Sequence, residues 1–317
     1  MDITIFLFGF LFGFAMQYAH LNRFNTISGM ATLEDFTMAK TMGFAIGLGA
    51  IFIAILVGLG LVEYHIKPIV PVANILGGLI FGLGMAILGY CPGTLPISLG
   101  QGALDALVGI VGGLLGGLCY TLLYEHIAPL RGDSLGSISV YSLTGQKPFL
   151  FYLITLIFGG ALMYVAFLLH KKGGGKNYRW LITGISFAII NSIMILPGVF
   201  DRTIGASTVY PYAADLIFGH TDGPYFEKIT PSGSFQIIFL AGAFLAGLLP
   251  ALIRRDFRLK MVHERWEKYK GDSVPRRIIW AFVGGFLLIF GARYAGGCAS
   301  GHILSGVMQM GVGSLLF

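Results

Sequence analysis

The chain has 317 residues, of which 56% are hydrophobic and only 11% are charged, with a formal net charge of +6. Soluble domains carry about 25% charged residues. The composition therefore excludes an ordinary soluble enzyme, a nucleic-acid-binding domain and a disordered chain. Three cysteines without a C-x-x-C pair also exclude a disulfide-stapled scaffold.

Five uncharged stretches indicate membrane-spanning helices. An α-helix needs about 20 apolar residues to cross the hydrocarbon layer. The stretches have 17 to 25 residues each and cover 3–19, 41–62, 148–169, 180–200 and 229–253. The sequence therefore predicts an all-α polytopic membrane protein.

The charges of the connecting segments predict the orientation. Segment 171–179 has four basic residues and no acid, and segment 254–277 has nine basic and four acidic residues. Segment 201–228 has four acidic and two basic residues. Because basic loops stay in the cytoplasm, we expect 171–179 and 254–277 inside, and 201–228 and 125–147 outside.

Two further regions are apolar but rich in helix breakers. Residues 68–124 and 278–317 contain one charge each, and each region reads as two helices joined by a glycine-rich turn with one cysteine. Several residues of the two regions match at an offset of 207 positions: Gly77-Gly78, Gly84, Gly89, Cys91 and Ser98 with Gly284-Gly285, Gly291, Gly296, Cys298 and Ser305. These matches predict an internal repeat.

The repeat and the loop charges together predict an inverted arrangement. We expect one integral membrane domain made of two inverted pseudo-repeats, 1–147 and 148–317, with re-entrant broken helices that enter from opposite faces. Residues 71–90 would be about 30 Å long as one helix. A hairpin over 68–124 that does not cross the membrane therefore requires this helix to tilt, or to unwind near Gly84 or Gly89.

The first cysteine turn, Gly89 to Thr94, contains Cys91, Pro92, Gly93 and Thr94. Non-helical backbone at membrane depth must line a cavity or be packed in protein. Backbone amides of such a turn, and the positive end of a helix that starts near Gln101, could bind an anion. Cys91 would add a polarizable sulfur and a weak S–H donor. The alternative is a packing turn with a small buried cysteine.

The second turn combines a thiol, a hydroxyl and an imidazole: Cys298, Ser300, Gly301 and His302 follow Arg293. An arginine inside a membrane segment is costly, so it is treated as functional by default. Arg293 could attract an anion toward Cys298. Its alternatives are snorkelling to the interface or pairing with Asp105, and those of His302 are a helix cap or a hydrogen bond in the bundle.

Other candidates are weaker. Asp105 is expected to complement the dipole of its own helix rather than to serve Arg293 or carry a proton, and Cys119 is expected to be core. The outside loop 202–212 reads equally well as an anion-collecting vestibule and as a structured surface loop. Segment 254–277 is expected to determine topology rather than to dock an acidic partner. Zinc is not expected, since a zinc site requires three or four ligands.

The motifs Gly-Tyr-Cys91-Pro-Gly-Thr and Gly291-Ala-Arg-Tyr-Ala-Gly-Gly-Cys298-Ala-Ser-Gly-His302 resemble the paired cysteine motifs of the YeeE/YedE family of bacterial sulfur-transport proteins. The resemblance implies an hourglass-shaped helical fold in which Cys91 and Cys298 pass thiosulfate along a central constriction. The family's thiosulfate permeases also have a cysteine after the first helix, and Asn25 stands near that place here. The family's cytoplasmic partner is a small sulfur-carrier or rhodanese-like protein.

The sequence therefore favours a multi-pass transporter in the bacterial inner membrane, surrounded by lipid, for a small inorganic sulfur anion such as thiosulfate. The alternatives are a transporter of a selenium species, a membrane thiol oxidoreductase and a non-transporting membrane subunit. We expect no enzymatic activity, no catalytic residue, no cofactor, no metal and no nucleic-acid partner. The sequence also lacks a nucleotide-binding Gly-x-x-x-x-Gly-Lys-[Ser/Thr] motif.

Overall fold

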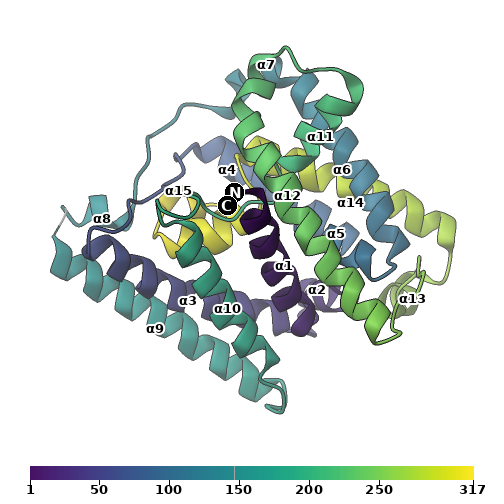
Figure 1. The fold of residues 1–317 in the computed structure, drawn as a ribbon, viewed down its shortest axis with the longest axis horizontal. Helices are drawn as coiled ribbons and strands as arrows, with labels where there is room; N and C mark the ends of the chain where they lie inside the picture. The colour runs from purple at the N-terminus through teal and green to yellow at the C-terminus, as the bar shows by residue number, and fades with distance from the viewer. Residues whose placement is uncertain (146) are drawn as a thin grey trace.

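The computed structural model describes residues 1–145 and 147–317, which fold as a bundle of helices (Figure 1). Within these residues the only β structure is two isolated bridges, one between Ala103 and Lys260 and one between Ser139 and Gly311. The prediction of an all-α polytopic membrane protein is confirmed.

Six helices of the described residues are long and apolar enough to cross a membrane: α3 (Thr37–Gly58), α4 (Pro71–Leu88), α6 (Leu104–Leu122), α9 (Pro148–Lys172), α12 (Pro224–Ile253) and α14 (Val274–Ala295). Two apolar helices are shorter: α1 (Asp2–Tyr18) and α10 (Arg179–Met194). The other helices are short: α2 (Phe24–Ala31), α5 (Thr94–Gly100), α7 (Tyr124–Ile127), η1 (Pro129–Arg131), α8 (Val140–Leu143), α11 (Val209–Phe218), α13 (Glu264–Lys270), the π-helix η2 (Ser300–Gly306) and α15 (Val312–Leu315).

All five predicted spans are helical, although two of them end early, and the expected span 41–62 ends at Gly58 as helix α3. The expected span 180–200 ends at Met194 as helix α10, and turns follow. Pro197 and Gly198 explain the early stop, because proline removes a backbone donor and glycine favours turns.

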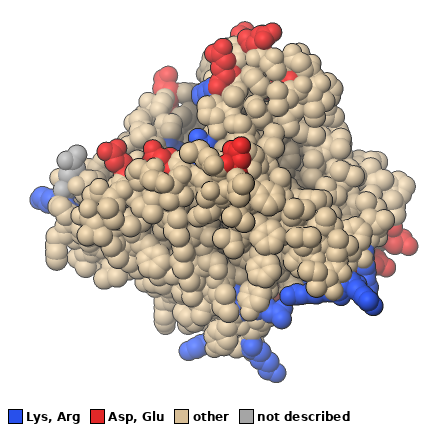
Figure 2. Space-filling model, in the orientation of Figure 1, with Lys and Arg blue, Asp and Glu red and all other residues tan. Residues whose placement is uncertain are grey.

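Charge separates the two ends of the bundle. In Figure 2, Lys and Arg side chains gather mainly at the lower end of the molecule and Asp and Glu side chains at the upper end. We call the end that carries segments 171–179 and 254–273 the basic end, and the end that carries α7 and α11 the acidic end. This separation is the arrangement that the positive-inside rule predicts for the two sides of a membrane.

Helix α14 lies between α4 and α6 and packs closely on both. It is antiparallel to α4, because Gly77 lies against Ala295 while Gly84 lies against Leu288. A methyl group added at Gly84 would come within 2.7 Å of the Leu288 Cα. Gly285 of α14 similarly lies against the Gly109 carbonyl of α6. Small residues thus bring three helices into backbone contact, as membrane bundles require.

Helix α4 shows where the first expected hairpin breaks. It runs unbroken from Pro71 to Leu88, a length of about 27 Å at 1.5 Å per residue. Gly84 does not break the helix because it is used for packing, and the helix ends only at Gly89, which adopts φ +77°. The helix therefore unwinds at Gly89, one of the two expected places, and the cysteine turn follows the basic end of α4, while the re-entrant path of the hairpin stays a prediction.

The same local design ends α14. Gly296 caps this helix at φ +82°, and Cys298 follows two residues later, as Cys91 follows Gly89. A left-handed residue at a helix end is usually glycine, because a Cβ is unfavourable there. The predicted helix–turn–helix is thus present in both regions, although the second arm of the Cys298 region is the short π-helix η2. The inverted relationship of the whole halves stays a prediction.

A buried ion pair joins α14, α6 and α4 at the basic end. Arg277 Nη2 lies 2.6 Å from Asp105 Oδ2, and both side chains are fully buried. His263 Nε2 contacts the same carboxylate at 3.0 Å. The guanidinium also donates to the Leu88 carbonyl at 2.6 Å. Asp105 does lie in the first turn of α6, but its carboxylate is held by Arg277 and His263, and the alternative pairing with Arg293 is wrong.

The orientation can be tested with reporter tags. We expect a tag after Lys172 or Lys260 to report the cytoplasm and one after Asp222 to report the outside, because the loop charges have opposite signs. Paired cytoplasmic and periplasmic reporters fused at each position provide the measurement. A periplasmic reporter that is active at Lys260 would contradict the predicted orientation.

Asp105→Asn should destabilise the protein by about 3–5 kcal/mol and lower its melting temperature by roughly 10 °C, because it leaves Arg277 buried and uncompensated. Thermal unfolding of the detergent-purified protein measures the shift. Glu264→Gln is the control: it breaks the exposed Lys260–Glu264 pair and should cost at most about 1 kcal/mol. Equal melting temperatures for the two variants would refute the structural role of the buried pair.

Candidate functional site

The turn around Cys91 is held closed by its own side chains. The Cys91 N–H donates to Thr94 Oγ1 at 2.9 Å, and Thr94 Oγ1 donates to the Cys91 carbonyl at 3.0 Å. Thr94, Pro92 and Gly93 are buried and Cys91 is half-buried. The Cys91 amide is therefore occupied rather than offered to an anion. Gln101 itself caps the C-terminus of α5, and the helix expected to start near it, α6, begins at Leu104.

The turn around Cys298 places several polar groups beside the sulfur. The Cys298 Sγ and Ser300 Oγ atoms lie 3.2 Å apart. The Ser207 side chain and the Ala206 backbone lie beside the same sulfur. Cys298 is buried, at 2% exposure, and is a free thiol, as is Cys91.

A loop from the acidic end, residues 204–208, lies between the two cysteine turns. The Ala206 backbone of this loop lies beside Cys298. The Ala206 Cβ faces the other turn, and a Cβ added to Gly93 would lie 3.3 Å from it. The Tyr210 hydroxyl, just after the loop, donates to the Pro92 carbonyl at 2.8 Å. On the other side, Ser305 Oγ lies 3.4 Å from the Ile204 carbonyl. The loop therefore contacts both turns and connects them.

A cavity of about 300 Å³ opens from the acidic end onto Cys298, and we call it the cysteine cavity. Four cations line it: Lys67, Arg202, Lys228 and Arg293. Among the described residues, no carboxylate lines it. Cys298, Gly301, Ser207 and Thr208 also line it. Four like charges at one cavity repel one another, and a bound anion would relieve that repulsion.

Arg293 is held in place by neutral partners. Its Nε atom donates to the Tyr225 hydroxyl at 2.7 Å and its Nη1 atom to Thr208 Oγ1 at 2.9 Å. Neither partner carries a negative charge, so the charge of Arg293 stays available to the cavity. This arrangement agrees with the predicted attraction of an anion toward Cys298, a role that stays a prediction.

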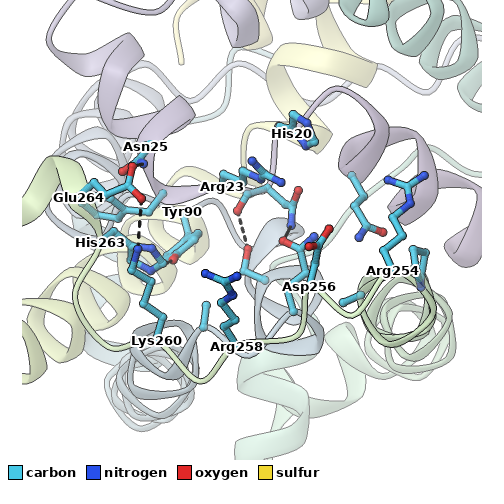
Figure 3. Close-up of a pocket in the computed structure, with 18 residues that line it drawn as sticks. His20, Arg23, Asn25, Tyr90, Arg254, Asp256, Arg258, Lys260, His263 and Glu264 are labelled. Atoms are coloured by element: carbon cyan, nitrogen blue, oxygen red, sulfur yellow. Dashed lines mark hydrogen bonds and ion pairs between the residues drawn. The ribbon is translucent and has the colours of Figure 1, made fainter.

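A second cavity, of about 350 Å³, opens at the basic end, and we call it the arginine cavity (Figure 3). It has four cations and two carboxylates in its walls, a surplus of two positive charges: Arg23, Arg254, Arg258, Lys260, Asp256 and Glu264. His20 also lines it. Burial, with the charges of Arg23 and Arg179, lowers the pKa of His20 to about 4, so this imidazole adds no charge near pH 7.

Asn25 belongs to the wall of the arginine cavity and not to the cysteine turns. Its Oδ1 atom accepts from the Arg265 backbone N–H at 3.2 Å, and its Nδ2 atom donates to Glu264 Oε2 at 3.4 Å. These contacts anchor α13 to α2. The side chain nearest the family's additional cysteine thus fastens α13 at the basic end.

His302 and Cys119 lie outside both cavity linings. His302 stacks on Phe317, with ring centroids 4.6 Å apart, and its Nδ1 atom lies 3.2 Å from Ser314 Oγ. This is the hydrogen bond in the bundle that was the alternative for His302. Cys119 is half-buried on α6.

Two important side chains were not predicted. Lys67 lines the cysteine cavity, and its ammonium donates to the Gly296 carbonyl at 3.1 Å. The signal was its place in the sequence, directly before the nearly uncharged region 68–124. Tyr210 was named only as part of the outside loop, and nothing in its sequence context indicated that it bonds to Pro92.

Two similarities to known proteins extend over nearly the whole chain. A family model described as sulphur transport matches residues 23–317. A protein of Spirochaeta thermophila named thiosulfate transporter TsuA is 23% identical over 324 residues, and the match covers 98% of this chain and 92% of that protein.

Arg293→Gln should raise the apparent KM for anion uptake by about tenfold or more, because a hydrogen bond from a charged group is worth about 1.5–3 kcal/mol. Initial uptake rates in membrane vesicles measure it. Arg131→Gln is the matched control: Arg131 donates to the Tyr294 carbonyl at 3.1 Å near the same helix end but does not line the cysteine cavity. An unchanged KM in Arg293→Gln would assign Arg293 a structural role only.

Proposed function

Because the chain belongs to the sulphur-transport family, which confirms the resemblance to YeeE/YedE proteins, we propose that it carries thiosulfate across the bacterial inner membrane from the acidic end to the basic end. The name of the Spirochaeta relative supports this choice of anion. The observation that carries the proposal is the cysteine cavity, where four cations, with no carboxylate among the described residues, surround a route to Cys298.

Attraction of the anion is the first step. Charged side chains are expensive within a membrane, and those that are retained there mark ion and substrate pathways. Lys67 and Arg293 are half-buried and face a common space with Arg202 and Lys228. A small dianion would bind here with charge-assisted hydrogen bonds, which are about twice as strong as neutral ones.

Selection for sulfur is the second step. Thiosulfate has one soft terminal sulfur and three hard oxygens. The oxygens suit the cations and the hydroxyls of Ser207 and Thr208, which line the cavity. The soft end suits the polarizable thiol of Cys298, which can also donate a weak S–H hydrogen bond.

Passage past the constriction is the third step. The route leads from Cys298 past Ala206 to the Cys91 turn, and from Tyr90 into the arginine cavity. Transient S–H hydrogen bonds from the two thiols would replace part of the hydration that the anion loses. The loop 204–208 contacts both turns, so a small displacement of it would open or close the route.

Release completes the cycle at the basic end. A small sulfur-carrier or rhodanese-like protein in the cytoplasm would receive the anion there, and the exposed basic residues of 254–277 would contact it. Uptake of labelled thiosulfate into vesicles that contain only this chain tests the transport itself. Competition by sulfite, sulfate and selenite identifies the preferred species. If selenite is carried and thiosulfate is not, the proposed substrate is wrong.

Cys91→Ala and Cys298→Ala should each reduce the rate of thiosulfate uptake by about tenfold or more. Such a loss corresponds to a rise of about 1.4 kcal/mol in the activation free energy for passage of the anion. Cys119→Ala is the matched control, since Cys119 is half-buried but lines neither cavity. Serine variants separate two mechanisms. If donated hydrogen bonds suffice, Cys91→Ser and Cys298→Ser should keep partial uptake, whereas contact with a soft sulfur or persulfide exchange would leave both inactive. Well-expressed alanine variants with wild-type uptake would refute the role of the thiols.

A further inference from the structure

The arginine cavity contains guanidinium groups that the protein itself does not pair. Within the described part of the chain, no carboxylate lies within 4.0 Å of the side chains of Arg23, Arg254 or Arg258. Other arginines at this end are paired: Arg277 with Asp105 and Arg265 with Glu34. In Figure 3, Arg23 and Arg258 lie on opposite sides of the opening.

The floor of this cavity is polar and directly follows the Cys91 turn. Ser98 Oγ donates to the Asn22 carbonyl at 2.5 Å, and Asn22 Nδ2 donates to Gln101 Oε1 at 2.7 Å. The side-chain oxygens of Gln17 and Asn22 are buried without a hydrogen-bond partner among the described residues. Buried polar atoms of this kind are normally satisfied by water or by a ligand. Because both atoms are amide oxygens, which accept hydrogen bonds, they suit a bound water, and the donors available to an anion are the guanidinium groups.

We propose that the arginine cavity is a second anion-binding site, which accepts the transported sulfur oxyanion after the Cys91 turn and holds it before release. This inference rests on the proposed function, because it takes the anion of that function as its ligand. Planar guanidinium groups present paired N–H donors that match the oxygens of an oxyanion. The three arginines come from separate parts of the chain, Arg23 from the N-cap of α2 and Arg254 and Arg258 from the segment after α12.

The two cavities differ in charge in a way that suits binding and release. Among the residues that the structure describes, the cysteine cavity has four cations and no carboxylate, whereas the arginine cavity also contains Asp256 and Glu264. Glu264 is occupied by Lys260 at 3.4 Å, and Asp256 remains to weaken the hold on an anion. Conduction requires sites that bind well enough for entry and weakly enough for exit, and several sites in series achieve this.

Binding to the full-length protein in lipid nanodiscs tests the proposal. Equilibrium dialysis with labelled thiosulfate should find two bound anions per wild-type chain and one in the double variant Arg254→Gln/Arg258→Gln. Arg293→Gln should lose the other anion. The matched control is Arg255→Gln/Arg276→Gln, which removes two exposed cations of the same end that do not line the cavity and should still bind two.

Transport from each side gives an independent readout. In inverted vesicles, which present the basic end to the label, Arg254→Gln/Arg258→Gln should raise the apparent KM by about tenfold or more, as expected for lost charge-assisted hydrogen bonds. In right-side-out vesicles its KM should stay at the wild-type value. If the double variant binds two anions and keeps its KM in inverted vesicles, the second site does not exist, although thiosulfate uptake would still support the proposed function. A wild-type protein that neither binds nor carries thiosulfate would overturn both proposals.

Discussion

Backbone that leaves a helix at membrane depth must find hydrogen-bond partners inside the protein, and the rest of this structure depends on how that requirement is met. Both helices that precede a cysteine turn end in carbonyl groups bound by a cation. Arg277 binds the Ile87 and Leu88 carbonyls of α4, and Lys67 binds the Gly296 carbonyl after α14. Positive charge at a helix C-terminus is also favoured by the helix dipole. The same two cations thus permit the breaks and fix where each turn begins.

Positioning by cations has a consequence for the route between the cavities. Lys67 belongs both to the capped end of α14 and to the wall of the cysteine cavity, so the group that stabilises the turn also faces the cavity. At the other end Arg277 is enclosed by Phe24 and Trp266, with its guanidinium 4.6 and 4.7 Å from their rings, and faces neither cavity. The cation at one turn is therefore open to a cavity, and the cation at the other turn belongs to a fully buried pair.

The length of the uncharged stretches and the positions of helix-breaking residues were sufficient to predict the long helices, because the apolar length that a span needs and the backbone sterics of glycine and proline are local properties of the sequence. They also located both glycine-ended turns and placed Arg293 at the cysteine cavity. They could not show that Gly84 packs instead of breaking α4, since a glycine serves either purpose and only its neighbour Leu288 decides. Partner choice was equally hidden: Asp105 selects Arg277, 172 positions away, and nothing near either residue in the sequence indicates the other.

The position of α14 between α4 and α6 also bears on how the chain is made. Helices α4 and α6 are complete by Leu122, whereas α14 begins at Val274, about 150 residues later. At synthesis rates of about 5–20 residues per second, this gap lasts roughly 8–30 s. During that time the glycine-lined faces of α4 and α6 have only lipid or an insertase to cover them, and Asp105 has no arginine. Assembly of the centre therefore waits for the last long helix, and a ribosome that stalls before residue 274 would leave an inserted but unfinished bundle for quality-control proteases.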